Sequence, residues 1–136
     1  MTAYLLDTNV CIKLLNGDNP RVIQRLAAQK PEEIYLCTIT QLELFYGAYR
    51  GTKTDKNLPK LARFFSQFTI LSFEPLAAEI AGKLRARLHQ LGTPIGGYDL
   101  QIAAIALAYQ LTLVTHNTRE FGRVEGLLYE DWEAQP

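Results

Sequence analysis

The chain has 136 residues, of which 48% are hydrophobic, and 14 lysines and arginines balance 14 aspartates and glutamates. This length and apolar content predict a single domain over residues 1–136 with a full hydrophobic core. The zero net charge excludes attraction of nucleic acid through overall charge, so any such function must depend on local basic patches.

The first half of the chain alternates short apolar strands with amphipathic helices. Gly17 is a typical residue after a helix end, and Asn19 followed by Pro20 is a typical helix start. The predicted elements, in chain order, are a strand at 4–6, a helix at 8–15, a helix from Pro20, a strand at 34–37, a helix from Thr40, a polar loop at 50–57 and a helix at 58–68.

The second half continues the same alternation. The predicted elements are a strand at 70–73, a helix from Pro75 that ends at Gly92, a helix at 98–109, a strand at 111–114 and a last strand at 127–129. The alanine-rich helix at 98–109 is apolar on most sides, so we expect it to be central. Strands separated by helices predict an α/β fold with a parallel sheet and helices on both of its faces.

Features that would point outside the cytoplasm are missing from this sequence. Asp7 interrupts the only candidate leader, and the longest apolar run is well short of the roughly 20 residues that a membrane span needs. Cys11 and Cys37 are far apart and flanked by apolar residues, which favours buried thiols over a disulfide. We therefore expect a soluble, cytoplasmic protein with no membrane partner.

Acidic and amide side chains follow the predicted strands, at the edge of a parallel sheet where ligands bind. Asp7 ends the first strand, and Glu43 lies one helical turn beyond the start of the helix that follows the second. Asp99 lies in the first turn of the helix opened by two glycines, and Asn117 follows the strand at 111–114. We expect these four side chains to converge on one rim.

Three carboxylates in one cleft repel one another. At about 4 Å and an effective dielectric constant near 20, each pair costs on the order of 4 kcal/mol. Such a cluster persists if a divalent cation neutralises it, and oxygen ligands without histidine or cysteine favour Mg²⁺ or Mn²⁺. A cation of this kind suits phosphodiester hydrolysis, because it activates water and stabilises the attacking and leaving oxygens without a side-chain nucleophile.

Each of these residues also has a purely structural explanation. Thr40 and Glu43 fit a capping box, Thr-x-x-Glu, which taken alone explains Glu43 at least as well as metal binding. Asp99 is favoured near a helix N-terminus by the helix dipole, and Asn117 fits a turn. Asp7 is the hardest to explain structurally, since it stands directly after a buried strand. From the residues alone, both interpretations stay open.

Four segments of the chain resemble the VapC toxins, which are PIN-domain ribonucleases of type II toxin–antitoxin modules. The segments, in the order of the family, are LLDTNVCI, TITQLELFYGA, GTPIGGYDLQIAA and LTLVTHNTREF. The resemblance covers nearly the whole chain, and GYDLQIAA followed by VTHNTREF is its most specific part. It implies one PIN domain, a small three-layer α/β/α sandwich with a central parallel sheet, and Mg²⁺- or Mn²⁺-dependent endonucleolytic cleavage of RNA, with tRNA as a candidate substrate.

The resemblance also assigns roles to individual residues. The acidic positions of the family fall on Asp7, Glu43 and Asp99, which it implies as catalytic metal ligands. Its fourth catalytic position, an aspartate in many PIN domains, is Asn117 here. Four further residues match the polar lining of the family's substrate pocket and a cation beside it, namely Thr8, Asn9, Thr115 and Arg119.

The partners implied by the resemblance are RNA, a co-expressed VapB-type antitoxin, a second copy of the chain in a homodimer, and operator DNA only through the antitoxin complex. The amphipathic helices after the second strand are candidates for a dimer or antitoxin groove. Basic residues at 50–63 and 83–89 are expected mainly on solvated faces, although an RNA-binding protein needs local cations. His116 adjoins the site, but its spacing does not predict a metal ligand.

Two rival functions remain. A haloacid-dehalogenase-type phosphotransferase also places an aspartate after its first strand and uses Mg²⁺. Its chemistry needs a second aspartate two residues later, where this chain has Asn9, and a later lysine after a strand, which is missing. The non-enzymatic rival is a binding module on a PIN scaffold with a decayed nuclease site, and the retained acidic residues argue against decay.

Overall fold

The strands form one parallel sheet in the order β3-β2-β1-β4-β5, in a computed structural model that describes residues 2–134. The central strand β1 (Tyr4–Leu6) pairs with β2 (Ile34–Cys37) on one side and with β4 (Thr112–Val114) on the other. The short strands β3 (Thr69–Leu71) and β5 (Tyr129–Glu130) form the two edges. All four pairings are parallel, so the strand ends that follow in the chain direction meet at one edge.

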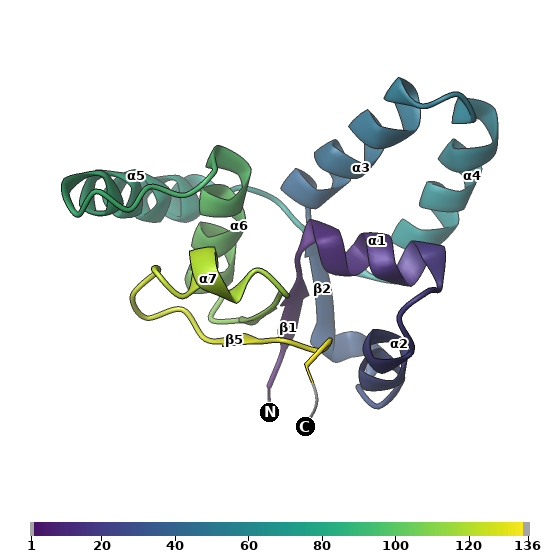
Figure 1. Ribbon diagram of the computed structural model, residues 1–136, viewed down its shortest axis with the longest axis horizontal. Helices are drawn as coiled ribbons and strands as arrows, with labels where there is room; N and C mark the ends of the chain where they lie inside the picture. The colour runs from purple at the N-terminus through teal and green to yellow at the C-terminus, as the bar shows by residue number, and fades with distance from the viewer. Residues whose placement is uncertain (1, 135–136) are drawn as a thin grey trace.

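Helices cover both faces of this sheet (Figure 1). In chain order they are α1 (Thr8–Asn16), α2 (Pro20–Ala27), α3 (Thr38–Arg50), α4 (Thr54–Phe65), α5 (Pro75–Gln90), α6 (Gly97–Ala108) and α7 (Thr118–Phe121), with a 3-10 turn at Pro31–Glu33. None of the helices within residues 2–134 combines the length and hydropathy that crossing a bilayer requires.

Successive residues of the central strands point into two separate cores. Leu5 and Leu113 belong to a core that contains buried residues of α5, α6 and α7. Leu6 and Val114 belong to a second core that contains buried residues of α1 to α4 and Trp132. Because strand side chains alternate between faces, each face of the sheet supports its own helical layer. The predicted three-layer α/β/α arrangement with a parallel sheet is confirmed.

The strands β1 and β2 begin and end where they were predicted, and α2 and α5 begin at the predicted prolines, Pro20 and Pro75. Several other boundaries differ. The edge strands are displaced from the predicted ranges 70–73 and 127–129. Helix α4 begins inside the predicted loop at 50–57, where the Thr54 hydroxyl donates to the Ala48 carbonyl at 2.8 Å and closes the turn from α3. The four-residue helix α7 was not predicted, because so short an element has no apolar periodicity to reveal it.

Helix α3 begins two residues earlier than predicted, and this corrects the interpretation of Thr40. Its N-cap is Cys37, which is extended and makes no side-chain capping bond. Thr40 therefore lies inside the first turn, and the capping box predicted for Thr40 and Glu43 is wrong. Both side chains have other partners, described below.

The order of the strands makes the carboxyl end of β1 a favourable place for a ligand-binding site. From β1 the chain proceeds to β2 and β3 on one side, and it then returns to β4 on the other side of β1. The carboxyl ends of β1 and β4 thus flank a topological switch point, where α/β proteins bind ligands. The backbone N–H of Asp7 donates to the Val114 carbonyl at 3.1 Å, which joins the two ends directly.

Candidate active site

Asp7 is a buried carboxyl group at the end of the central strand, only 4% exposed. Its Oδ1 atom accepts from the Val10 backbone N–H at 2.9 Å, so the side chain caps α1 while its strand ends. Burial raises the pKa of Asp7 to about 6, against lowering by hydrogen bonds from Thr115 and Val10, and the Glu43 charge raises it further. The capping role does not remove the cost of burying the charge.

Glu43 and Thr8 meet beside Asp7. The hydroxyl of Thr8 lies 2.6 Å from Glu43 Oε1 and 3.2 Å from the hydroxyl of Thr40, which is fully buried. Glu43 is half-buried and near enough to raise the pKa values of both Asp7 and Asp99. The structure therefore brings together the three acidic residues that the sequence singled out.

Asp99 has an unpredicted acidic neighbour, Glu120. Burial raises the pKa of Asp99 to about 7, and a hydrogen bond with Glu120 and the charges of Glu120, Asp7 and Glu43 raise it further. Glu120 lies in α7, shortly after β4, and sequence reasoning missed it because no helix was predicted at residues 118–121. Its position three residues after Asn117 was the available signal. We call Asp7, Glu43, Asp99 and Glu120 the crevice acids.

Asn117 contacts both Glu120 and Thr115. Its side-chain amide donates to Glu120 Oε2 at 2.9 Å, and its backbone N–H donates to the Thr115 hydroxyl at 3.0 Å. Thr115 is fully buried and its hydroxyl also bonds to Asp7. Through these contacts the segment after β4 links Asp7 to Glu120.

Two of the other predicted pocket residues, Asn9 and Arg119, are exposed. Asn9 lies in the first turn of α1, and Arg119 lies in α7 beside Glu120. None of the ion pairs between residues 2–134 involves Arg119, so its guanidinium group is available to a charged ligand. Thr8, which was also predicted to line the pocket, is buried against Glu43.

The donors in the crevice fit a hard divalent cation. They are carboxylate, hydroxyl and amide oxygens, which are the ligands that Mg²⁺ and Mn²⁺ prefer. Asp7 and Asp99 hold protons more tightly than ordinary aspartates, because burial and neighbouring charges disfavour their ionised forms. A divalent cation would favour those ionised forms and displace the protons.

A second titratable cluster lies nearby. Within residues 2–134, His116, Asp131 and Glu133 form the one group of three whose ligand atoms lie within 4.8 Å of one another, and the crevice acids are spaced more widely. The Nδ1 atom of His116 lies 3.0 Å from Asp131 Oδ2, while Glu133 accepts from Asn19 and lies 3.9 Å from Lys13 Nζ. These contacts tie the C-terminal segment to α1 and α2, so the cluster already has a structural role.

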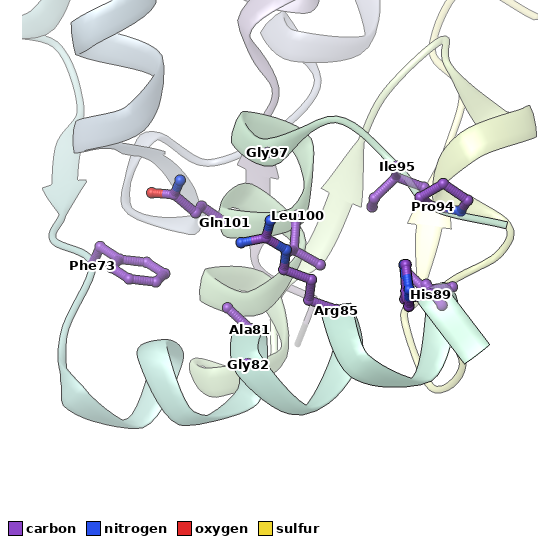
Figure 2. A pocket seen from close by; sticks show the side chains of 11 residues that line it. Phe73, Ala81, Gly82, Arg85, His89, Pro94, Ile95, Gly97, Leu100 and Gln101 are labelled. Carbon is purple, nitrogen blue, oxygen red and sulfur yellow. The ribbon is translucent and has the colours of Figure 1, made fainter. Parts of the chain in front are cut away.

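Cavity size alone does not locate the crevice. A cavity of about 520 Å³ lies between α5 and α6 and contains none of the crevice acids. Figure 2 shows Arg85 and His89 of α5 and Leu100 and Gln101 of α6 among the side chains that line it. A smaller groove of about 320 Å³ between α1, α3 and α4 does include Glu43, and its apolar walls are formed by Ile12, Leu15, Leu44, Gly47, Ala48 and Leu61. We call it the α1–α3–α4 groove.

Comparison with known proteins agrees with this geometry. The family model described as PIN domain matches residues 4–127. The chain is 36% identical over 132 residues to a tRNA(fMet)-specific endonuclease VapC of Shigella flexneri, covering 97% of this chain and 99% of that protein. It is 37% identical over 131 residues to Ribonuclease VapC2 of Rickettsia felis, covering 96% and 98%.

Two solved structures are similar over nearly their full length. VapBC2 from Rickettsia felis, bound to a DNA fragment from its promoter, matches with a TM-score of 0.89 and 34% identity, covering 96% of this chain and 99% of that one. DNA-bound VapBC from Salmonella typhimurium matches with a TM-score of 0.90 and 36% identity, covering 97% and 99%. The similarity therefore includes both the sequence and the three-layer fold.

The burial of Asp7 predicts that Asp7→Asn stabilises the chelated protein at neutral pH. The pKa of Asp7 is about 6 in the fold against an ordinary value of 3.8, so the carboxylate opposes folding above about pH 6 and has no such effect below its ordinary pKa. Asparagine keeps the helix-capping acceptor. Urea unfolding in EDTA should show a gain of at most ~3 kcal/mol at pH 7.5, vanishing near pH 3.5. An equal gain at both pH values, or a loss at pH 7.5, would contradict this account.

Proposed function

The chain belongs to the PIN domain family and, within it, to the VapC ribonucleases, and we propose that its crevice acids hold a divalent cation that serves RNA hydrolysis. The observation that carries the proposal is the convergence of Asp7, Glu43 and Asp99 at the β1–β4 switch point. Mg²⁺ is the first candidate and Mn²⁺ the second, since both prefer such oxygen donors. We infer that the whole chain acts as one PIN domain.

Each of these side chains has a separate role in the proposed reaction. When bound, the cation supplies a water of lowered pKa and offsets the charge that develops on the phosphate. Asp7, which is buried, and Asp99, which is half-buried, provide negative charge, and Thr8 holds Glu43 through its 2.6 Å hydrogen bond. Asn117 holds Glu120 in the same way, at 2.9 Å. Arg119, exposed beside Glu120, is placed to bind a phosphate of the substrate.

The substrate is RNA, and tRNA is the first class to test. The relative from Shigella flexneri is named a tRNA(fMet)-specific endonuclease. A chain with zero net charge must bind RNA through local cations, and Arg119, which precedes Glu120 in α7, is the first candidate. The basic residues at 50–63, on α3 and α4, are the next candidates. Such a substrate implies that the protein works in the cytoplasm.

The proposed partner is a VapB-type antitoxin. The similar structures from Rickettsia felis and Salmonella typhimurium are VapBC complexes with DNA, so we infer that operator DNA is contacted only through such a complex. The α1–α3–α4 groove offers an apolar floor that ends at Glu43. An amphipathic helix would fit the apolar part, and an arginine beyond it would pair with the carboxylate.

A second copy of the chain is also expected. Helix α3 exposes an apolar stripe at helical spacing, in which Leu42 is 46% exposed and Tyr46 and Tyr49 are each 64% exposed. Contiguous apolar side chains of this kind mark interaction surfaces. We propose that a homodimer uses this stripe.

The two rival functions fit less well. A haloacid-dehalogenase-type phosphotransferase needs a carboxylate at the position of Asn9, which is an exposed amide. A decayed binding module would have no reason to keep several buried or half-buried carboxyl groups whose pKa values are raised by their neighbours.

RNA cleavage by the purified protein should stop in EDTA and return with added Mg²⁺ or Mn²⁺, because the crevice acids repel one another and bind substrate phosphates only through a cation. A fluorogenic RNA or a tRNA pool resolved on a gel provides the measurement. Full activity after exhaustive chelation would refute the metal-dependent mechanism.

Glu120→Gln should lower RNA cleavage by about tenfold or more and raise the Mn²⁺ concentration needed for half-maximal rate, since it removes one of the cluster's charges. Glutamine can still accept from Asn117, so the local fold should hold. Glu125→Gln is the control, because Glu125 is an exposed acid paired with Arg87. Equal rates for both variants and the wild type would exclude Glu120 from the centre.

Gly47→Gln should weaken binding of the antitoxin by about tenfold or more, because a long side chain would occupy the α1–α3–α4 groove. Gly82→Gln on α5 is a matched control, since an added Cβ at either helical glycine meets nothing within 4 Å. The candidate antitoxin is the product of any small open reading frame adjacent to the gene, and calorimetry would give its affinity. Unchanged affinity of the Gly47 variant would place the antitoxin on another surface.

A further inference from the structure

We propose that the buried hydroxyl of Thr40 is a positioning group for the metal site, which orients the Glu43 carboxylate through the hydroxyl of Thr8. Thr40 and Glu43 lie one turn apart on α3, and Thr8 begins α1. The inference rests on the proposed function, in which Glu43 binds the cation.

The three side chains form a continuous chain of contacts. Thr8 Oγ1 lies 2.6 Å from Glu43 Oε1 and 3.2 Å from Thr40 Oγ1. Thr40 is fully buried and Thr8 is 9% exposed, so bulk water does not compete for either hydroxyl. Thr40 Oγ1 lies in turn 3.8 Å from the Sγ atom of Cys37, which is also fully buried.

The chemistry of the groups fixes the direction of these bonds. A hydroxyl group has one hydrogen, and an ionised carboxylate can only accept. The 2.6 Å contact has the length typical of a hydroxyl donating to a carboxylate, so the Thr8 hydrogen points to Glu43. Thr8 must then accept from Thr40, because its own hydrogen is already used.

The contact between Cys37 and Thr40, at the other end of this series of hydrogen bonds, is compatible with the same donor direction. With its hydrogen given to Thr8, Thr40 is free to accept a hydrogen from the Cys37 thiol. Burial raises the pKa of that thiol, which therefore keeps its hydrogen. Hydrogens thus run from Cys37 to Thr40, from Thr40 to Thr8 and from Thr8 to Glu43.

This order matters for metal binding because it restricts the rotation of the Thr8 hydroxyl and of the Glu43 side chain. A Thr8 hydroxyl that accepts from Thr40 has its own hydrogen directed away from Thr40 and toward Glu43. The Glu43 side chain is then held before a cation arrives, which lowers the entropy lost on binding. Partners that orient a metal ligand typically contribute 10- to 100-fold to metal affinity.

A purely structural role for Thr40 makes a different prediction. The Thr40 hydroxyl does not cap α3, because the helix begins at Thr38. If its role were purely structural, its loss would lower stability without changing metal affinity. Two matched substitution pairs separate the alternatives. Thr40→Val keeps the branched shape and removes the hydroxyl, while Thr40→Ser and Thr40→Ala both lose the methyl group and differ from each other in the hydroxyl alone.

The experiment measures the affinity of each full-length variant for Mn²⁺ alone by titration calorimetry, together with Tm in EDTA. We expect Thr40→Val and Thr40→Ala to bind Mn²⁺ about 10- to 100-fold more weakly than the wild type, and Thr40→Ser to bind within a few-fold of it. The Ser and Ala pair decides the matter if the Val variant does not fold. Equal affinities for Ser and Ala would overturn the proposal.

Glu43→Gln separates failure of this inference from failure of the proposed function. If Glu43→Gln leaves Mn²⁺ affinity unchanged, the assignment of Glu43 as a ligand is wrong and the positioning role falls with it. If Glu43→Gln weakens Mn²⁺ binding but Thr40→Ala does not, only the positioning role is wrong. In the expected case, Thr40→Ala has little further effect on affinity when added to Glu43→Gln, because both act through one carboxylate.

Discussion

The structure depends on holding negative charge inside the protein at the end of its central strand. Asp7 is 4% exposed, and its acidic neighbours raise the cost of ionising it. Two contacts compensate for this cost in part: the Val10 N–H caps the carboxylate, and Thr115 donates to it. Such an arrangement opposes folding when taken alone, and the proposed cation would offset this cost by favouring the ionised carboxylates. In that proposal, the crevice acids lower the stability of the metal-free fold and favour cation binding.

The sheet order makes that arrangement possible. Because β1 is central, the ends of β1 and β4 deliver Asp7 and Thr115 side by side, and α3 and α6 bring Glu43 and Asp99 from opposite layers. The crevice thus lies where the two helical layers meet, and neither layer alone contains it. A change in the packing of either layer against the sheet would alter distances within the centre.

Local patterns in the sequence predicted the strands, the layer order and the convergence of Asp7, Glu43 and Asp99, because an acid after an apolar strand is visible without knowledge of the fold. Contacts between distant segments were not visible. The contacts that Thr8 makes with Thr40 and Glu43 span 32 and 35 residues, and they replaced the predicted capping box. Glu120 was missed because its four-residue helix is too short for periodicity and its partner Asp99 lies in a different element.

Glu43 belongs both to the crevice and to the end of the α1–α3–α4 groove. In the proposed function, an inhibitor seated in this groove would pair with the same carboxylate that binds the cation. A substitution of Glu43 that weakened inhibition would then weaken catalysis as well. Under that proposal, variants that lose inhibition but keep activity would be confined to the apolar walls of the groove.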